Sequence, residues 1–110
     1  MILALNIGNT NITIGAIRGQ TIVFQARLRT DVTKTSDEYA IDLKMLLSIR
    51  DISTAQIEGA IVSSVVPQVL NAMKTALRKL FSKNILVVGP GIRTGLNIRI
   101  DNPAQTGADL

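Results

Sequence analysis

Cysteine and histidine are both absent from the 110 residues of the sequence. Without cysteine there is no disulfide framework, no thiolate nucleophile and no cysteine-bound metal ion. Without histidine, acid–base chemistry by an imidazole is excluded as well. Any catalytic proton transfer would therefore use Asp, Glu, Lys or a hydroxyl group, and a carboxylate is the natural candidate for a base.

Aromatic residues are also scarce, at 3% of the sequence, whereas hydrophobic residues make up 46%. Aliphatic side chains must therefore fill the core, and there are enough of them for the chain to fold. A chain of this length has room for one core, so we expect a single domain over residues 1–110. No apolar run is long enough to cross a membrane and no signal-type cleavage site follows Met1, so a cytoplasmic location is the default expectation.

Positive charge is in excess, with a formal net charge of +4 and a pI of about 10.0, which raises the question of nucleic-acid binding. The basic residues are scattered, and one group of them lies on the polar side of a single expected helix: Lys74, Arg78, Lys79 and Lys83. No aromatic residues that could stack on bases are interleaved with them. A solvated helix face is the better explanation, and nucleic-acid binding is the weaker interpretation.

The spacing of apolar residues predicts one α/β unit. The expected strands cover residues 2–7, 11–17, 21–30, 57–62 and 85–88. Helices are expected from a capping box at Thr35 and Glu38 to about Ile49, and from Pro67 to Phe81. The result is a mixed five-stranded sheet, flanked by helices, whose first three strands are antiparallel. This order resembles a ribonuclease H-like domain of the actin-like ATPase type, although a fold alone does not establish function.

Two of the expected strands have distinct surroundings. Residues 2–7 are almost continuously apolar, which suits a central strand that is covered on both faces. The strand over residues 21–30 alternates instead, with Ile22, Phe24, Ala26 and Leu28 on one face and Gln25, Arg27 and Arg29 on the other. Such alternation is typical of a strand with one solvated face, so we expect this strand at an edge of the sheet.

The turn between the first two strands contains Gly8, Asn9, Thr10 and Asn11. Glycine there allows a close approach of the backbone to a ligand, or a positive φ. Backbone amides and small polar side chains in such a hairpin can hold phosphate oxygens. An ordinary hairpin turn has the same composition, and on the turn alone that interpretation is the better one.

Four short stretches extend the comparison beyond this turn. They are Leu5 to Thr10, Arg29-Thr30 with Lys34 to Glu38, Ser63 to Pro67, and Asp101-Asn102-Pro103 with Gly107-Ala108-Asp109. In order and spacing they resemble the N-terminal part of a type III pantothenate kinase. The first is similar to the family's phosphate motif, Asp-x-Gly-Asn-Thr, and the last to its pantothenate motif, Asp-Asn-Pro followed by Gly-Ala-Asp-Arg. Any one stretch would be a weak match, whereas the four together are specific.

The resemblance implies a reaction, its cofactors and an assembly. Members of this family transfer the γ-phosphoryl group of ATP to the terminal hydroxyl of pantothenate, which gives 4'-phosphopantothenate in the first step towards coenzyme A. They use Mg²⁺ with ATP and a monovalent cation, K⁺ or NH₄⁺, and they work as homodimers. Phosphoryl transfer depends mainly on charge neutralisation and positioning, which a hairpin of amides and hydroxyls with Mg²⁺ can provide.

The resemblance also implies functional residues. The ATP phosphate-binding residues would be Asn6, Ile7, Gly8, Asn9, Thr10, Asn11, Ile12 and Thr13. The pantothenate-binding residues would be Gly107, Ala108, Asp109 and Leu110, within a substrate-motif tail over residues 92–110. Asp109 would be the catalytic base on the attacking hydroxyl. Without the resemblance, a solvated turn or terminal aspartate is the better interpretation of Asp109.

The chain departs from the family at two positions and in its length. Asn6 replaces the family's Asp at the metal-facing position, and an amide oxygen is a weaker Mg²⁺ ligand than a carboxylate. Leu110 replaces the family's Arg. The second ribonuclease H-like half, with the monovalent cation site, would lie beyond residue 110. We therefore expect the 110 residues alone to be poorly active or inactive, and to associate with a copy or with a C-terminal half through the apolar stretch 87–96.

A different class of function is the alternative. Bvg accessory factor proteins resemble the same family and are linked to transcription, so the chain would be a non-catalytic regulatory module. Asn6 and the basic charge favour this alternative slightly. The intact Gly107-Ala108-Asp109 favours the kinase.

Overall fold

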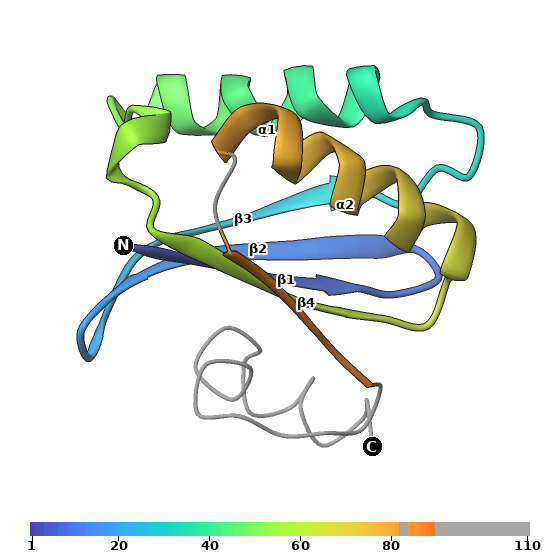
Figure 1. Ribbon diagram of the computed structural model, residues 1–110, viewed down its shortest axis with the longest axis horizontal. Coiled ribbons are helices and arrows are strands. Elements are labelled where there is room, and N and C mark those ends of the chain that lie inside the picture. The colour runs from blue at the N-terminus through green and yellow to red at the C-terminus, as the bar shows by residue number, and fades with distance from the viewer. Residues whose placement is uncertain (82–83, 90–110) are drawn as a thin grey trace.

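The computed structural model describes residues 1–81 and 84–89, in which two helices cover one face of a five-stranded mixed sheet (Figure 1). The strands are β1 (Ile2–Ile7), β2 (Asn11–Arg18), β3 (Thr21–Arg29), β4 (Gly59–Ser64) and β5 (Asn84–Val88). The helices are α1 (Ser36–Ile49) and α2 (Pro67–Phe81), with a short 3₁₀ turn at Thr54–Gln56. The strand order is β3-β2-β1-β4-β5, which confirms the expected mixed sheet and places β3 at an edge, as predicted.

Strand β1 is the centre of this sheet. It pairs antiparallel with β2 on one side and parallel with β4 on the other. Its side chains alternate between two apolar environments: Leu3, Leu5 and Ile7 join the main core, whereas Ala4 packs in a second cluster on the opposite face. Burial on both faces explains why the sequence of β1 is nearly continuous in apolar residues.

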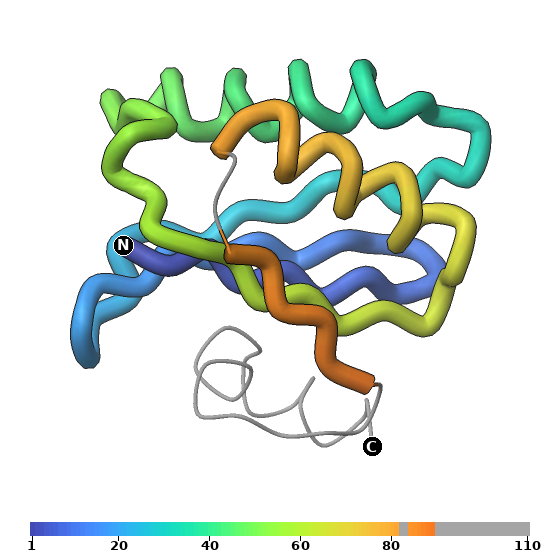
Figure 2. Tube along the Cα trace, viewed as in Figure 1, coloured from blue at the N-terminus to red at the C-terminus, as the bar shows by residue number. Residues whose placement is uncertain are grey.

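Both helices pack on the same face of the sheet, as Figure 2 also shows. Helix α1 begins with the predicted capping box: the Thr35 Oγ1 accepts from the Glu38 N–H at 3.2 Å, and the Glu38 side chain accepts from the Thr35 N–H at 2.9 Å. Tyr39, Leu43 and Leu47 of α1 are buried. Helix α2 buries Val69, Met73, Ala76, Leu77 and Phe81. None of the helices in the described part of the chain is long and apolar enough to cross a membrane.

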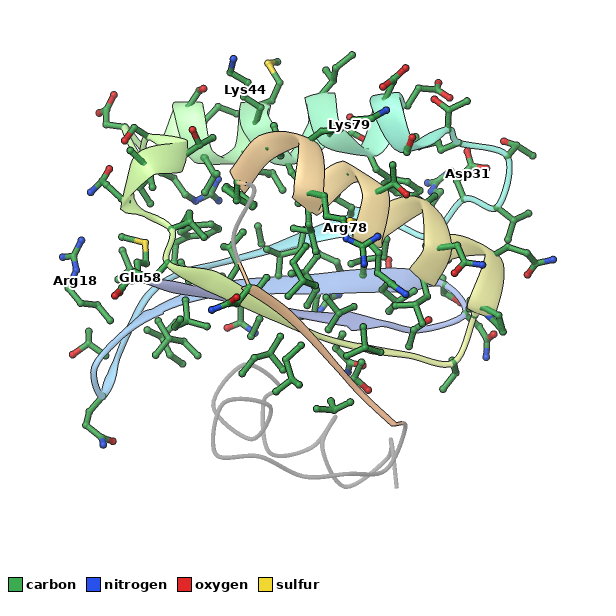
Figure 3. All side chains as sticks on the ribbon, viewed as in Figure 1. Arg18, Asp31, Lys44, Glu58, Arg78 and Lys79 are labelled. Atoms are coloured by element: carbon green, nitrogen blue, oxygen red, sulfur yellow. The ribbon has the colours of Figure 1, made fainter. Side chains whose placement is uncertain are left out.

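The sequence predicts a solvated polar face for α2, but one residue of this face, Lys79, forms an ion pair with α1. Lys79 lies between the two helices (Figure 3), where its ammonium forms an ion pair with Asp37 in the first turn of α1. Both side chains are largely exposed, so this pair contributes little to the free energy of unfolding.

The boundaries of β4 correct the sequence-based expectation of a strand over residues 57–62. A 3₁₀ turn precedes the strand, and the Ile57 N–H donates to the Thr54 C=O at 3.1 Å, so Ile57 ends that turn. Pairing with β1 begins at Gly59 and continues to Ser64. Ser63 and Ser64, which lie beyond the end of the expected strand, therefore belong to β4.

A bulge in β3 corrects the predicted facing of Ile22. The register passes from Ala16 opposite Phe24 to Ile17 opposite Ile22, so Val23 is an additional residue in β3. A bulge of this kind reverses the alternation of side chains beyond it. Ile22 consequently packs with Ala4 and Ile17 on the face opposite to the main core, whereas Phe24 packs against the main core.

The end of α1 generates a prediction about stability. Asp51 follows this helix with a φ of 57°, and it is the sole non-glycine residue with positive φ in the described ranges 1–81 and 84–89. Its N–H donates to the Ser48 C=O at 3.0 Å, and the next N–H, of Ile52, donates to the Leu47 C=O at 2.9 Å. This is the C-terminal cap geometry that glycine adopts without steric cost.

We expect Asp51→Gly to raise the free energy of unfolding by about 0.5–1 kcal/mol, since it relieves the left-handed strain of a residue with a Cβ. Thermal and urea unfolding would measure the gain. Asp51→Ala is the matched control, because it also removes a carboxylate from the negative end of the helix dipole but keeps the Cβ. An equal gain in both variants would show that the charge is responsible and that backbone strain is not.

Candidate functional site

The carboxyl ends of β1 and β4 lie side by side and form the end of the sheet where a site is expected. In open α/β sheets, ligands bind outside the carboxyl ends of parallel strands, where the chain leaves neighbouring strands in different directions. Here β1 continues into the turn to β2, and β4 continues into α2, at the same end of the molecule (Figure 2). The Val65 N–H donates to the Ile7 C=O at 3.1 Å, which holds the two exits together.

The turn at residues 8–11 occupies this end of the sheet. The Gly8 N–H donates to the Asn11 C=O at 2.9 Å and closes the hairpin. A Cβ on Gly8 would lie 3.2 Å from the same Asn11 oxygen, so a larger residue would require the two backbone segments to move apart by a few tenths of an ångström. The positive φ that the sequence allowed for Gly8 is not used.

The eight predicted phosphate-binding residues divide into Gly8, which is half-buried at the start of the turn, and three further groups. Asn9, Thr10 and Asn11 are exposed in the turn and its exit. Ile7 and Ile12 are fully buried in the main core, so they can offer only backbone groups to a ligand. Asn6 and Thr13 lie on the sheet rather than in the turn. The predicted Gly107, Ala108, Asp109 and Leu110, with the tail over residues 92–110, lie outside the described residues.

Asn6 belongs to a polar row that crosses the sheet. In register, Asn6 pairs with Thr13 of β2 and with Ser63 of β4. All three face away from the helices, because Leu5 and Ile7, the neighbours of Asn6, point into the main core. Thr13 and Ser63 are buried, at 9% and 6% exposed. Ser63 was missed as a site residue because the sequence ended its strand at Val62; the polar Ser63-Ser64 pair after an apolar run was the available signal.

Two arginines of β3 continue this face towards the edge of the sheet. Arg27 lies opposite Thr13 and Arg29 lies opposite Asn11 in the β2–β3 register. Both are exposed, and neither takes part in a salt bridge with the described part of the chain. They place positive charge beside a turn whose own side chains are neutral. The sequence showed their alternation but not their position opposite the turn.

The segment after β3 contacts the turn directly. The Thr30 N–H donates to the Thr10 C=O at 2.9 Å, and its Oγ1 donates to the Gly8 C=O at 2.8 Å. The next residue, Asp31, is held by the Tyr39 hydroxyl, which accepts from the Asp31 N–H at 3.0 Å and donates to the Asp31 C=O at 2.9 Å. Tyr39 is a buried residue of α1, and its polar contact has no signal in the apolar periodicity.

The other side of the site is held by Ser64 at the end of β4. Its hydroxyl accepts from the Val66 N–H at 2.9 Å and donates to the Val66 C=O at 3.0 Å. The Leu70 N–H also donates to that carbonyl, at 3.0 Å. Ser64 therefore sets the backbone between β4 and the first turn of α2.

Charged groups of the loop before α1 are paired or hydrogen-bonded locally. The Lys34 ammonium lies 2.5 Å from Oδ2 of Asp42, and this hydrogen bond raises the pKa of Lys34. The Thr33 hydroxyl and N–H donate to Oδ1 of Asp31 at 2.5 and 2.9 Å. These bonds hold the pKa of the Asp31 carboxyl below its ordinary value, the hydroxyl being the larger cause. Asp31 (Figure 3) is therefore ionised at neutral pH.

The described donor groups suit phosphate oxygens better than a protein-held metal ion. No group of three or more His, Cys, Asp or Glu side chains that could hold a metal ion exists within residues 1–81 and 84–89. Asn6 offers an amide oxygen, and Thr13 and Ser63 offer hydroxyls, so the row contains no anionic oxygen. Mg²⁺ binds in proteins through carboxylates, phosphates and water, and the phosphates would have to supply the charge here.

Comparison with solved structures defines the class of fold. The chain is similar to a putative N-acetylglucosamine kinase of Porphyromonas gingivalis (TM-score 0.61, 16% identity) and to a ROK hexokinase of Thermus thermophilus (TM-score 0.59, 12% identity), covering 81% of this chain in each case. It spans 34% and 33% of those two proteins. A Bacteroides thetaiotaomicron protein with an actin-like ATPase fold and unknown function matches over 98% of this chain and 36% of its own length, with a TM-score of 0.58 and 7% identity. The fold is thus the expected ribonuclease H-like, actin-like ATPase fold.

The sequence comparison is more specific than the fold. Residues 2–110 match the type III pantothenate kinase family. The chain belongs to this family, which confirms the resemblance drawn from the four motifs. The roles of the individual site residues remain predictions.

The local hydrogen bonds of Asp31 generate a prediction about pH. Thr33→Val removes the hydroxyl, so we expect the pKa of Asp31 to rise towards its ordinary value of 3.8. A lowered carboxyl pKa stabilises the folded chain above the ordinary pKa, and this stabilisation is lost as the pH falls through the folded pKa. The variant should therefore lose less stability between neutral pH and the acid range than the wild type does. NMR titration of the Asp31 carboxyl carbon measures the shift, and Thr33→Ser, which keeps a hydroxyl, should leave it nearly unchanged.

Proposed function

We propose that these 110 residues form the phosphate-binding part of an ATP-dependent pantothenate kinase. The observation that carries the proposal is the position of the exposed turn 8–11 at the carboxyl ends of β1 and β4, in a chain that belongs to the type III pantothenate kinase family. The exposed groups of this turn and the polar row beside it are small and neutral, as a close approach to phosphate oxygens requires.

The reaction transfers the γ-phosphoryl group of ATP to the terminal hydroxyl of pantothenate. The amides and side chains of Asn9, Thr10 and Asn11 would hold phosphate oxygens, and the guanidinium groups of Arg27 and Arg29 would offset phosphate charge. Asp109, outside the described residues, would accept the proton of the attacking hydroxyl. Positioning and charge stabilisation of this kind supply most of the catalysis in phosphoryl transfer.

Cofactors and assembly belong to the same proposal. Mg²⁺ would neutralise the phosphate charge and would reach the site bound to ATP, with Asn6 as a weak ligand. The monovalent cation, K⁺ or NH₄⁺, would bind outside these 110 residues, and the active assembly would be a homodimer. The comparisons give no support to the regulatory alternative.

Asn6 provides the sharpest test of the phosphate site. Asn6→Asp adds one anion in the polar row with little change in shape. Without a divalent cation it should repel triphosphate, and with Mg²⁺ it should draw the metal–nucleotide complex in. One good charged contact is worth roughly 1.5–3 kcal/mol, so we expect affinity to change by about tenfold or more in each direction.

Calorimetric ATP titration with Mg²⁺ and with a chelator measures the expected rise and the expected fall in ATP affinity. Asn84→Asp is the matched control, since Asn84 is exposed and pairs with Gly59 at the far end of the sheet from the turn. If Asn6→Asp binds ATP as the wild type does in both conditions, the hairpin is not the phosphate site.

Catalysis gives a second test. We expect the 110 residues alone to form no detectable phosphopantothenate, because they correspond to about a third of the kinases they resemble and water exclusion needs a closed cleft. Addition of the C-terminal half of a family member should restore ATP-dependent product, measured by mass spectrometry. Robust product from the 110 residues alone would contradict the expectation, and no product in the reconstituted mixture would contradict the proposed function.

A further inference from the structure

Thr30 is the point at which β3 and the turn 8–11 are joined. It uses two separate donors: its N–H binds the Thr10 C=O at 2.9 Å, and its hydroxyl binds the Gly8 C=O at 2.8 Å. The first bond continues the β2–β3 pairing by one residue. The second reaches past β2 to the end of β1, so one residue connects the ends of three strands.

The bond to the Gly8 carbonyl has a geometric consequence for the next amide. The Gly8 C=O and the Asn9 N–H belong to one planar peptide group, and the peptide bonds of the described residues are all trans. In a trans peptide these two groups point in opposite directions. Because Thr30 holds the carbonyl, it also directs the Asn9 N–H away from itself, and Asn9 is an exposed residue of the turn. Such oriented amides make anion-binding positions.

Thr30 is itself held in place from α1. The phenol of Tyr39 is fully buried at 0% exposed, and its hydroxyl binds both backbone groups of Asp31, at 3.0 and 2.9 Å. Asp31 is the covalent neighbour of Thr30, so the backbone on which Thr30 sits is fixed by the core. A path of hydrogen bonds thus runs from Tyr39 through Asp31 and Thr30 to the Gly8–Asn9 peptide.

We propose that Thr30 is a positioning residue for phosphate binding: it orients the Gly8–Asn9 peptide, and Tyr39 supports it through Asp31. This inference rests on the proposed function in one respect, namely that phosphate binds at the turn. Thr30 contributes through the turn and does not itself contact phosphate.

Three variants separate this role from simple loss of stability. Thr30→Val keeps the shape and removes the hydroxyl, Thr30→Ser restores the hydroxyl, and Tyr39→Phe keeps the buried ring and removes the contact with Asp31. The first readout needs no ligand: the backbone NMR order parameters of Asn9 and Thr10, compared with those of Ala4 in the centre of β1. The second readout is calorimetric affinity for Mg²⁺-ATP and for inorganic triphosphate with Mg²⁺, in the 110-residue chain.

We expect Thr30→Val to lower the backbone order parameters of Asn9 and Thr10, while that of Ala4 stays unchanged. The affinity for both anions should fall by about tenfold, which corresponds to the loss of one hydrogen bond of about 1–1.5 kcal/mol. Thr30→Ser should retain wild-type order and affinity. Tyr39→Phe should change both readouts in the same direction as Thr30→Val, by a smaller factor.

The two readouts distinguish failure of the inference from failure of the proposed function. If Thr30→Val leaves the order of Asn9 unchanged, or if Thr30→Ser fails to restore it, the positioning role is overturned. If the turn loses order in Thr30→Val and both anions bind with wild-type affinity, phosphate does not bind at the turn, and the inference fails together with the proposed site. If the wild-type chain binds neither anion, the proposed function fails, and the order parameters still decide whether Thr30 orients the turn.

Discussion

Double-sided pairing of β1 is the constraint on which the rest of this structure depends. Every other strand takes its place from β1: β2 on one edge, β4 on the other, and β3 and β5 outside them. Because β1 is also covered on both faces, its residues must be apolar on the helix side and small or apolar on the other. On the face away from the helices, Ala4 is followed by the polar Asn6 near the carboxyl end of β1, whereas Ile7 on the helix side is still fully buried. The candidate site thus lies where the outer face of the central strand changes from apolar to polar.

A polar row inside a sheet is tolerated only if its groups have partners. An unpaired buried hydroxyl or amide costs free energy comparable to a lost hydrogen bond. Thr13 and Ser63 are buried, and no buried side-chain nitrogen or oxygen of the described residues lacks a hydrogen-bond partner. No side-chain nitrogen or oxygen of the row Thr13–Asn6–Ser63 is therefore both fully buried and unpaired, so the row is compatible with the folded sheet before any ligand arrives. Preorganisation of this kind reduces the entropic cost of ordering the site when a ligand binds.

The sequence predicted the parts of the fold that depend on local periodicity. The apolar run of β1, the alternation of β3 and the capping box at Thr35 each have a signal within a few residues, and each is confirmed. The start of β4 could not be predicted in this way, because the apolar Ile57 looks like strand but ends a 3₁₀ turn. The face of the sheet on which Ile22 lies depends on a bulge in β3. The bulge arises from the pairing of β3 with β2, so the sequence of β3 alone does not predict it.

The candidate site was predicted less completely than the fold, for a similar reason. Motifs in the sequence identified the turn 8–11 because its residues are contiguous. Ser63, Arg27 and Thr30 reach the site from three other segments, and only strand register brings them together. The role of the Tyr39 hydroxyl is harder still to predict from the sequence. Packing alone explains a buried aromatic residue in a helix, and only the structure shows its hydrogen bonds to Asp31.

Charge determines what this site can bind. A turn of neutral amides and hydroxyls can orient an anion but gives little net attraction in water, where screening weakens distant charges. Arg27 and Arg29 lie on the same face of the sheet, two residues apart on β3, and form no salt bridge with the described residues that would neutralise them. Asn6 is a neutral amide, so it adds no negative charge that would diminish this attraction. Under the proposed function, the protein would attract a polyphosphate directly and its metal ion mainly through the phosphate. An aspartate at position 6 would shift the proposed site towards the metal–anion complex, because a carboxylate binds Mg²⁺ more strongly than an amide does.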